Sequence, residues 1–242
     1  MPKETTERTI VFGATGYTGT ALIKQLASRP DTDVFAHVRP NSKQRDQLQT
    51  TCNTDGTHCV VTDWTLEDIK TMLAEVNPTL VFATLGTTKK RQRASNDKDA
   101  ETYKAIDYGL TVMVIRALVE LQLSPLFVYL SSMGVSDKAP GAYLHARFEA
   151  ENYLKHSELP YLIARPSFIT GADREEFRAG ERIGASIADV GLTVAGLVGF
   201  VGLRDRYQSL TASELAAAMI DAVDSGERDV TLDARNLRNR IR

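Results

Sequence analysis

The sequence predicts an α/β fold in which a mostly parallel, doubly wound sheet is flanked by helices. Short apolar segments rich in β-branched residues alternate with amphipathic stretches along most of the 242 residues, as strands alternate with helices. The apolar segments are nearly continuous, which is expected of strands buried on both faces. A glycine-rich loop joins the first apolar segment to the first amphipathic stretch. Short connections of this kind are typical of the doubly wound architecture.

Six strands and five helices are expected along the chain. The apolar segments predict strands over residues 9–12, 34–38, 58–62, 80–83, 126–130 and 161–164. The amphipathic stretches predict helices over residues 18–27, 66–75, 99–121, 141–156 and 213–223. Thr65 is placed to cap the second of these helices.

Two longer segments interrupt this alternation. One is a polar loop over residues 85–98, and the other is a glycine-containing segment over residues 172–210. Because each follows the carboxyl end of a predicted strand, where ligands bind in doubly wound sheets, both are candidate pocket walls. We expect a single domain over residues 1–242, in which residues 172–242 form a small C-terminal appendage on the substrate side.

Composition and charge disfavour several classes of function. The formal net charge of −2 disfavours a globally basic nucleic-acid binder. The longest apolar stretch, residues 190–203, is too short to cross a bilayer as a helix, and no signal peptide is visible. Cys52 and Cys59 lack the spacing of a metal site or a disulfide framework. We therefore expect no metal, no nucleic acid, no integral membrane segment and a cytoplasmic location.

The loop Gly13-Ala14-Thr15-Gly16-Tyr17-Thr18-Gly19 lies between a predicted strand and a predicted helix. In that context its glycine spacing predicts a site for the pyrophosphate of a dinucleotide. Glycine permits a tight turn, a close approach of the backbone to phosphates, and close packing of helix on sheet. The helix N-terminus offers N–H groups and a partial positive charge. The residues expected to contact the cofactor here are Gly13, Thr15, Gly16, Tyr17, Thr18 and Gly19.

The end of the second predicted strand indicates which dinucleotide is bound. An acidic residue at this position binds the ribose 2′-hydroxyl of NAD, whereas an arginine accepts the 2′-phosphate of NADP. Arg39 occupies this end, while Asp31 and Asp33 precede the strand. NADP(H) is therefore favoured over NAD(H). Asp63, after the third strand, either binds the adenine amino group or supplies negative charge at the start of the next helix.

Further motifs are spread over nearly the whole chain. They are Asp63-Trp64, the ATLGTT segment at 83–88, the YLSS segment at 129–132, a tyrosine opening the following helix, and Ala164-Arg165-Pro166-Ser167. With these motifs the chain resembles the atypical and extended branches of the short-chain dehydrogenase/reductase superfamily, an NAD(P)-binding Rossmann family. Within it, LGTT followed by basic residues, together with LSSMG, resembles the group containing the HIV Tat-interacting oxidoreductase-like protein.

The resemblance implies a catalytic serine and a catalytic tyrosine. The serine is Ser132, with Ser131 as the alternative, and the tyrosine is Tyr143. A tyrosine titrates near pH 10, and a fixed cation beside it stabilises the phenolate. The family places lysine four residues after the tyrosine, but Arg147 stands there. Arg147 keeps the positive charge and is expected to reach a ribose hydroxyl, although arginine does not readily pass on a proton.

Other positions carry further expectations from the resemblance. Asp107 stands where many family members have an asparagine that takes part in a proton relay, and simple helix polarity explains it equally well. Leu85, Gly86, Pro166 and Ser167 follow two of the predicted strands. The resemblance places them against the cofactor.

Three functions follow from this sequence. The first is an NADP(H)-dependent oxidoreductase that transfers a hydride to or from a small carbonyl or hydroxyl compound. The alternative is an NADP(H)-binding redox sensor or scaffold with little or no turnover. The third and weaker one is a nucleotide-sugar epimerase or dehydratase, for which few residues remain after the sixth strand.

Two questions about partners accompany these functions. The helices at 99–121 and 141–156 are candidates to pair across a two-fold axis in a homodimer, as in relatives. The basic run Lys89-Lys90-Arg91-Gln92-Arg93 is either a solvated loop or a surface that attracts an anionic substrate or partner.

Overall fold

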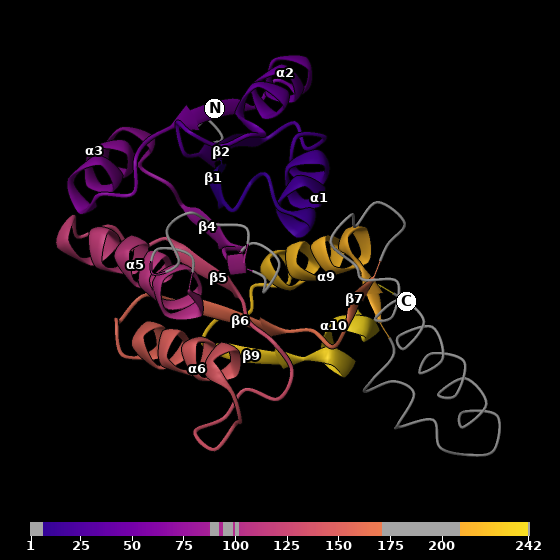
Figure 1. Ribbon diagram of the computed structural model, residues 1–242. Helices are drawn as coiled ribbons and strands as arrows, with labels where there is room; N and C mark the ends of the chain where they lie inside the picture. Colours follow the sequence, from indigo (N-terminus) through magenta and orange to yellow (C-terminus); the bar gives the residue numbers. More distant parts are fainter. Residues whose placement is uncertain (1–6, 88–91, 94–98, 100–101, 171–208, 242) are drawn as a thin grey trace.

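The structure is a computed structural model that describes residues 7–87, 92–93, 99, 102–170 and 209–241 (Figure 1). Within these residues, seven parallel strands form one sheet in the order β3-β2-β1-β4-β5-β6-β9. The strands are β1 (Glu7–Phe12), β2 (Thr32–Val38), β3 (His58–Val61), β4 (Leu80–Ala83), β5 (Leu126–Leu130), β6 (Tyr161–Arg165) and β9 (Val230–Asp233). A separate short pair consists of β7 (Ile169–Thr170) and β8 (Leu210–Thr211). The predicted doubly wound parallel sheet is confirmed.

Helices cover both faces of this sheet. One face carries α1 (Tyr17–Leu26), α2 (Arg45–Asp55), α9 (Ala212–Asp224) and α10 (Ala234–Asn239). The other face carries α3 (Leu66–Val76), the π-helix η1 (Lys104–Leu110), α5 (Thr111–Glu120) and α6 (Ala142–Lys155). Within β1, Ile10 and Phe12 pack toward α3 and α5 while Val11 packs toward α1. Because both faces of the strand are buried, its sequence is apolar throughout rather than alternating.

Several elements differ from the sequence-based expectations. The predicted helix over 99–121 begins as η1 and continues as α5. The sequence patterns did not predict α2, in which Leu48 and Cys52 are buried on an otherwise polar helix. They also missed β9 and α10, which have four and six residues. Thr65 does cap α3, because its hydroxyl accepts a hydrogen bond from the Asp68 N–H at 3.1 Å.

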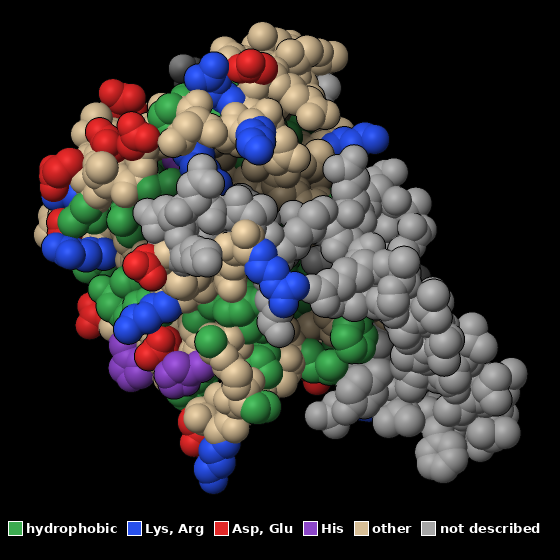
Figure 2. Space-filling view, viewed as in Figure 1, with side chains coloured by type: hydrophobic (Ala, Val, Ile, Leu, Met, Phe, Trp, Pro, Cys, Tyr) green, Lys and Arg blue, Asp and Glu red, His purple; other side chains and the backbone are tan. Residues whose placement is uncertain are grey.

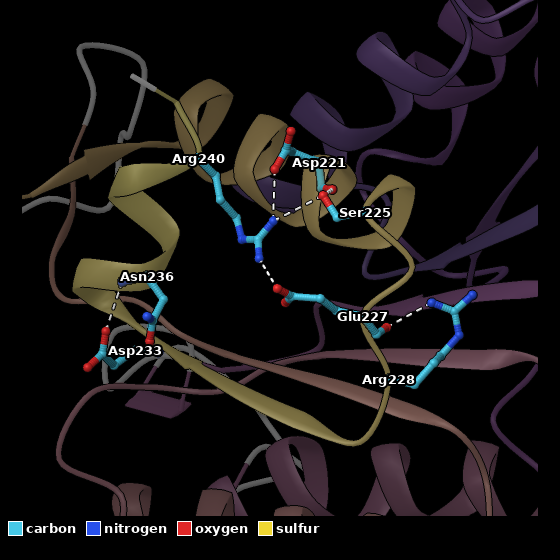
Figure 3. A network of polar contacts seen from close by, with 7 residues as sticks. All are labelled: Asp221, Ser225, Glu227, Arg228, Asp233, Asn236 and Arg240. Carbon is cyan, nitrogen blue, oxygen red and sulfur yellow. Dashed lines mark hydrogen bonds and ion pairs between the residues drawn. The ribbon is translucent and has the colours of Figure 1, made fainter.

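Ion pairs and a capping box hold the C-terminal elements together (Figure 3). Arg240 forms an ion pair with Asp221 of α9 at 2.8 Å and a second one with Glu227. Asp233 and Asn236 form a reciprocal capping box at the start of α10. Because β9 pairs in parallel with β6, this strand extends the main sheet.

Two segments singled out in the sequence lie outside the described residues. They are residues 89–91 of the basic run and nearly all of the segment over 172–210. In the part of the chain that is described, none of the helices has the length and apolar character needed to span a membrane. On the face shown in Figure 2, the described acidic and basic side chains are interspersed over the surface.

Candidate cofactor and active site

The sheet changes direction between β1 and β4. The chain runs outward from β1 through β2 to β3, and then returns to place β4 on the other side of β1. The glycine loop follows β1, and residues 85–87 follow β4. Both segments therefore lie at the carboxyl ends that flank the switch point, where dinucleotides bind in such sheets.

The three glycines of the loop differ in what requires them. Gly13 has φ +84°, and a Cβ there would lie 2.8 Å from the carbonyl oxygen of Thr84. At Gly19 a Cβ would lie only 2.1 Å from the Gly13 oxygen, so α1 packs directly on the loop. Gly16 is exposed and its N–H donates to the Gly13 oxygen at 2.8 Å. The turn and the packing thus require Gly13 and Gly19, and Gly16 leaves the outer surface of the loop without a side chain.

Two hydrogen bonds hold the glycine loop in place, and no side-chain hydrogen bond caps the N-terminus of α1. Thr84 Oγ1 donates to the Phe12 oxygen at 2.9 Å, and Tyr17 Oη donates to the Thr170 oxygen at 3.1 Å. Thr18 is buried, and no side chain caps α1 at Gly16. The first turn of α1 contains no acidic residue. This N-terminus therefore suits an anion such as a phosphate.

A cavity of about 600 Å³ lies between α1 and α2. Thr15 of the glycine loop contributes to its wall together with Ile23, Lys24, Leu48 and Thr51. This volume is within the range of small-molecule sites. Hydrophobic periodicity did not predict α2, and so it did not predict the part of the cavity wall that this helix forms. The available signal was Gly56, which ends α2 with φ +70° as helix-terminating glycines do.

Arg39 and Asp63 follow two paired strands. Val38 at the end of β2 is opposite Val61 at the end of β3, so both residues lie at the same edge of the sheet. Arg39 is half-buried and Asp63 is exposed. Thr65 caps the next helix. The side chain of Asp63 is therefore not used as that cap and can face a ligand at this edge of the sheet.

The structure brings Tyr143 and Arg147 together on α6. Tyr143 is half-buried in the first turn, and the Cζ atom of Arg147 lies 5.4 Å from the centroid of its ring. The ring of Tyr103 meets the Tyr143 ring edge-on at 5.2 Å. Arg147 Cζ also lies 5.5 Å from the Tyr129 ring centroid. A cation at this distance is attracted by the ring face.

The guanidinium of Arg147 is bound by three parts of the chain. Nη1 donates to the Leu130 oxygen at 2.6 Å and to Tyr129 Oη at 3.1 Å. Nη2 donates to the Leu85 oxygen at 3.0 Å and pairs with Asp107 Oδ1 at 2.8 Å. Three hydrogen bonds and one ion pair therefore surround the two terminal nitrogens.

Burial and charge act in opposite directions on this group. Burial disfavours the charged guanidinium, but the oxygens of Tyr129, Tyr143 and Asp107 outweigh that effect and keep the pKa of Arg147 above its ordinary value. Burial also raises the pKa of Tyr129 to about 12. Arg147 is therefore a permanent buried cation beside two phenol rings.

The two serines after β5 have different surroundings. Ser131 is buried, and its hydroxyl donates to Glu151 Oε1 at 2.5 Å. Glu151 in turn accepts two hydrogen bonds from Arg165, at 2.9 and 2.5 Å. Ser132 is half-buried, and its hydroxyl lies 3.3 Å from the Met133 oxygen. Ser132 is therefore better placed than Ser131 to meet a ligand.

Sequence reasoning missed Glu151, and it named Arg165 within a motif without its contact to Glu151. The signal for Glu151 was the helical spacing, because it follows Tyr143 by eight residues and Arg147 by four and so shares their face of α6. Pro166 is buried, and its oxygen accepts a hydrogen bond from the Met133 N–H at 2.9 Å. This bond joins the segments that follow β5 and β6.

The comparisons with known proteins agree with this geometry. The model of the family described as NAD(P)H-binding matches residues 13–195. A comparison with curated proteins finds no match.

Solved structures show the same fold at low identity. The UDP-Glc/GlcNAc 4-epimerase from Campylobacter jejuni is 12% identical with a TM-score of 0.66, over 96% of this chain and 82% of that one. A protein described as an NAD-dependent epimerase/dehydratase from Bacillus halodurans is 18% identical with a TM-score of 0.65, over 96% and 99%. A short-chain dehydrogenase/reductase from Veillonella parvula in complex with NADP is 13% identical with a TM-score of 0.59, over 91% and 88%.

These neighbours share the Rossmann-like fold of this chain. The family match begins at Gly13, the first glycine of the loop, and continues past β6. Since this match spans well over half of the 242 residues, the chain belongs to the NAD(P)H-binding family.

Proposed function

We propose that this protein is an NADP(H)-dependent oxidoreductase that transfers a hydride to or from a small carbonyl or hydroxyl compound. The observation that carries the proposal is the ring of Tyr143 beside the buried cation of Arg147, 5.4 Å away. A phenol beside a fixed positive charge can give up and regain a proton. The family match supports a bound dinucleotide, which would exchange the hydride while Tyr143 exchanges the proton.

The described residues fit such a cofactor. The turn at Gly13 and the uncapped start of α1 suit a pyrophosphate. Arg39 would bind the 2′-phosphate, and Leu85, Gly86, Pro166 and Ser167 would line the nicotinamide half. When bound, the cofactor supplies or accepts the hydride.

The protein's own groups handle the substrate oxygen. Ser132 would hold the substrate by donating a hydrogen bond to its carbonyl oxygen. Tyr143 would donate its proton to that oxygen during reduction and take a proton back during oxidation. Arg147 would stabilise the phenolate by its charge without itself exchanging a proton.

The test is the oxidation of NADPH with a panel of ketones, aldehydes and quinones. Replacing Tyr143→Phe removes the proton donor, so kcat should fall by roughly 100-fold or more. Tyr161→Phe is the matched control, because Tyr161 begins β6 at the end of the strand opposite Arg165 and so lies away from the proposed site. A wild-type rate in Tyr143→Phe would exclude this mechanism.

A second candidate is an NADP(H)-binding sensor or scaffold with little turnover. It is favoured by the surroundings of Arg147, because three hydrogen bonds and one ion pair within the protein already engage its two terminal nitrogens. A lysine-like proton relay has no counterpart in that arrangement. Tight NADPH binding without hydride transfer across the whole substrate panel would favour this candidate over the first.

We also propose that two chains associate through α5 and α6. The two helices pack side by side on one face of the sheet. Val119 on α5 and Tyr153 on α6 are large exposed apolar side chains. A second copy of the same helical layer would bury both of them.

A further inference from the structure

We propose that Asp107 is a positioning residue for the active site. Together with Arg147 it forms one buried ion pair that fixes both the segment after β4 and the cation beside Tyr143. This inference rests on the proposed function, since it assigns Asp107 a task in binding the cofactor and in turnover. Asp107 does not itself contact the reacting atoms.

The carboxylate of Asp107 contacts both Arg147 and the backbone after β4. Asp107 is fully buried on η1. Its Oδ1 lies 2.8 Å from Arg147 Nη2, and its Oδ2 accepts a hydrogen bond from the Thr87 N–H at 3.0 Å. The same Nη2 donates to the Leu85 oxygen at 3.0 Å. The ion pair therefore binds the backbone on both sides of Gly86.

Gly86 lies between these two backbone contacts. A Cβ on Gly86 would lie 2.7 Å from Arg147 Nη2 and 3.3 Å from Asp107 Oδ1. The ion pair thus occupies the space that a side chain at position 86 would need. The backbone of residues 85–87 packs directly on the pair, so this segment depends on both charges for its position.

Asp107 also acts on Arg147 through its charge. Two charges are retained in a protein interior when they are paired and hydrogen-bonded. Leu85, Leu130 and Tyr129 offer neutral acceptors to Arg147, whereas Asp107 offers a carboxylate with its side chain fully buried. Asp107 therefore contributes the strongest term that decides where the guanidinium rests.

The helix that carries Asp107 has an unusual geometry. Residues 104–110 are π-helical, and the Thr111 hydroxyl donates to the Asp107 carbonyl oxygen at 3.0 Å. π-Helical turns within longer helices are rare and frequently occur at functional sites. Here the π-helical turn carries the carboxylate that pairs with α6.

The experiment compares two variants of the full chain. Asp107→Asn keeps the shape of the side chain and leaves the charge of Arg147 unpaired. Asp107→Asn combined with Arg147→Gln removes both charges, and glutamine is too short to replace the contacts of arginine. The readouts are Tm, the Kd of NADPH from nicotinamide fluorescence, and kcat and KM with a carbonyl compound or quinone that the wild type reduces.

Asp107→Asn should lower Tm. It should also raise the Kd of NADPH and lower kcat, each by about tenfold or more. The double variant should regain at least half of the lost Tm, because no unpaired buried charge remains, while Kd and kcat stay impaired. Asp224→Asn is the matched control, since it breaks an exposed ion pair with Arg29 on the other face of the sheet. It should change none of the readouts.

The outcomes separate this inference from the proposed function. Wild-type Kd and kcat in Asp107→Asn would overturn the positioning role. Full recovery of both in the double variant would also overturn it, because the pair would then serve folding alone. If the wild type binds NADPH without turnover, the Kd values decide the question. If it binds neither NADPH nor NADH, both proposals fail.

Discussion

Arg39 is the residue on which the proposed preference for NADP(H) depends. It follows β2 at the edge of the sheet where Asp63 follows β3. Its guanidinium can bind a phosphate through two parallel hydrogen bonds, which a neutral side chain of similar length cannot do. The contact would be made to the 2′-phosphate, which NADH lacks.

Arg39→Gln should therefore weaken NADPH binding and leave NADH binding nearly unchanged. A lost charge-assisted contact corresponds to about 1.5–3 kcal/mol, or roughly 10–100-fold in the Kd of NADPH. Titration of both cofactors by fluorescence measures this. Arg228→Gln, at an exposed arginine after α9, should affect neither Kd. Equal losses for NADPH and NADH would show that Arg39 does not read the 2′-phosphate.

His37 is a single buried residue that couples stability to pH. It lies in β2 between the rings of Phe12 and Trp64, with centroid distances of 5.0 and 4.8 Å. Its Nε2 is 2.8 Å from Thr62 Oγ1. Burial lowers the pKa of His37 from 6.5 to about 4. The folded protein therefore holds this histidine neutral under conditions where the unfolded chain protonates it.

The sign of the pH effect follows from that difference. The unfolded chain binds more protons than the folded one as the pH falls from 6.5 toward 4, so stability present above pH 6.5 is lost across this window. The full loss from His37 is about 3 kcal/mol. Urea unfolding between pH 7.5 and pH 4 measures it. His37→Gln should flatten the dependence, and His156→Gln, at an exposed histidine, should not. Parallel curves for wild type and His37→Gln would contradict the assignment.

Some site residues could be predicted because a local pattern encodes them. The spacing of Gly13, Gly16 and Gly19 reports a backbone requirement within one turn, and the structure reproduces its steric reasons. The choice between the two serines was different, because Ser131 is bound by a carboxylate 20 residues away. The pairing of Asp107 with Arg147 spans 40 residues in the same way, so no local spacing indicates it.

At the scale of elements, α6 carries much of the site along one face. Tyr143, Arg147 and Glu151 follow each other at intervals of four residues, so they stand one above another. Arg147 binds the ends of β4 and β5, while Glu151 binds Ser131 after β5 and Arg165 at the end of β6. One helix thereby fixes three neighbouring strand ends relative to Tyr143.

The elements that sequence patterns missed share a physical cause. Hydrophobic periodicity detects a helix when a broad apolar stripe faces the core. In α2 the buried apolar contacts come from Leu48 and Cys52, which is too narrow a stripe. The strand β9 has four residues at the edge of the sheet. A short edge strand buries little and leaves a weak pattern.

At the scale of the whole molecule, the alternation of strands and helices indicated the architecture but not every neighbour. Parallel strands joined by helices must lie in one sheet with right-handed crossovers. The return from β3 to the far side of β1 creates the switch point, and this depends on tertiary packing rather than on local sequence. The last strand, β9, extends the sheet beyond β6 and so sets its outer edge.

The proposed homodimer is a prediction about the outer layer formed by α5 and α6. Val119 and Tyr153 are 46% and 38% exposed there. A stable interface usually buries more than about 1,000 Å² of total surface with an apolar centre, so a two-fold contact of this helical layer would enclose both side chains. We expect the wild type to sediment at twice the mass of one chain.

Replacing both residues with glutamate should shift the protein to monomer, because two pairs of like charges would then meet across the two-fold axis without water. Val61→Glu is the matched control. Val61 is a similarly exposed valine, 41% accessible, on β3, which is the strand at one edge of the sheet. It should leave the mass unchanged. A wild type that sediments as a monomer would exclude the dimer. A dimer that survives both glutamates but not Val61→Glu would place the interface at the β3 edge instead, because that edge presents unpaired strand groups to a second chain.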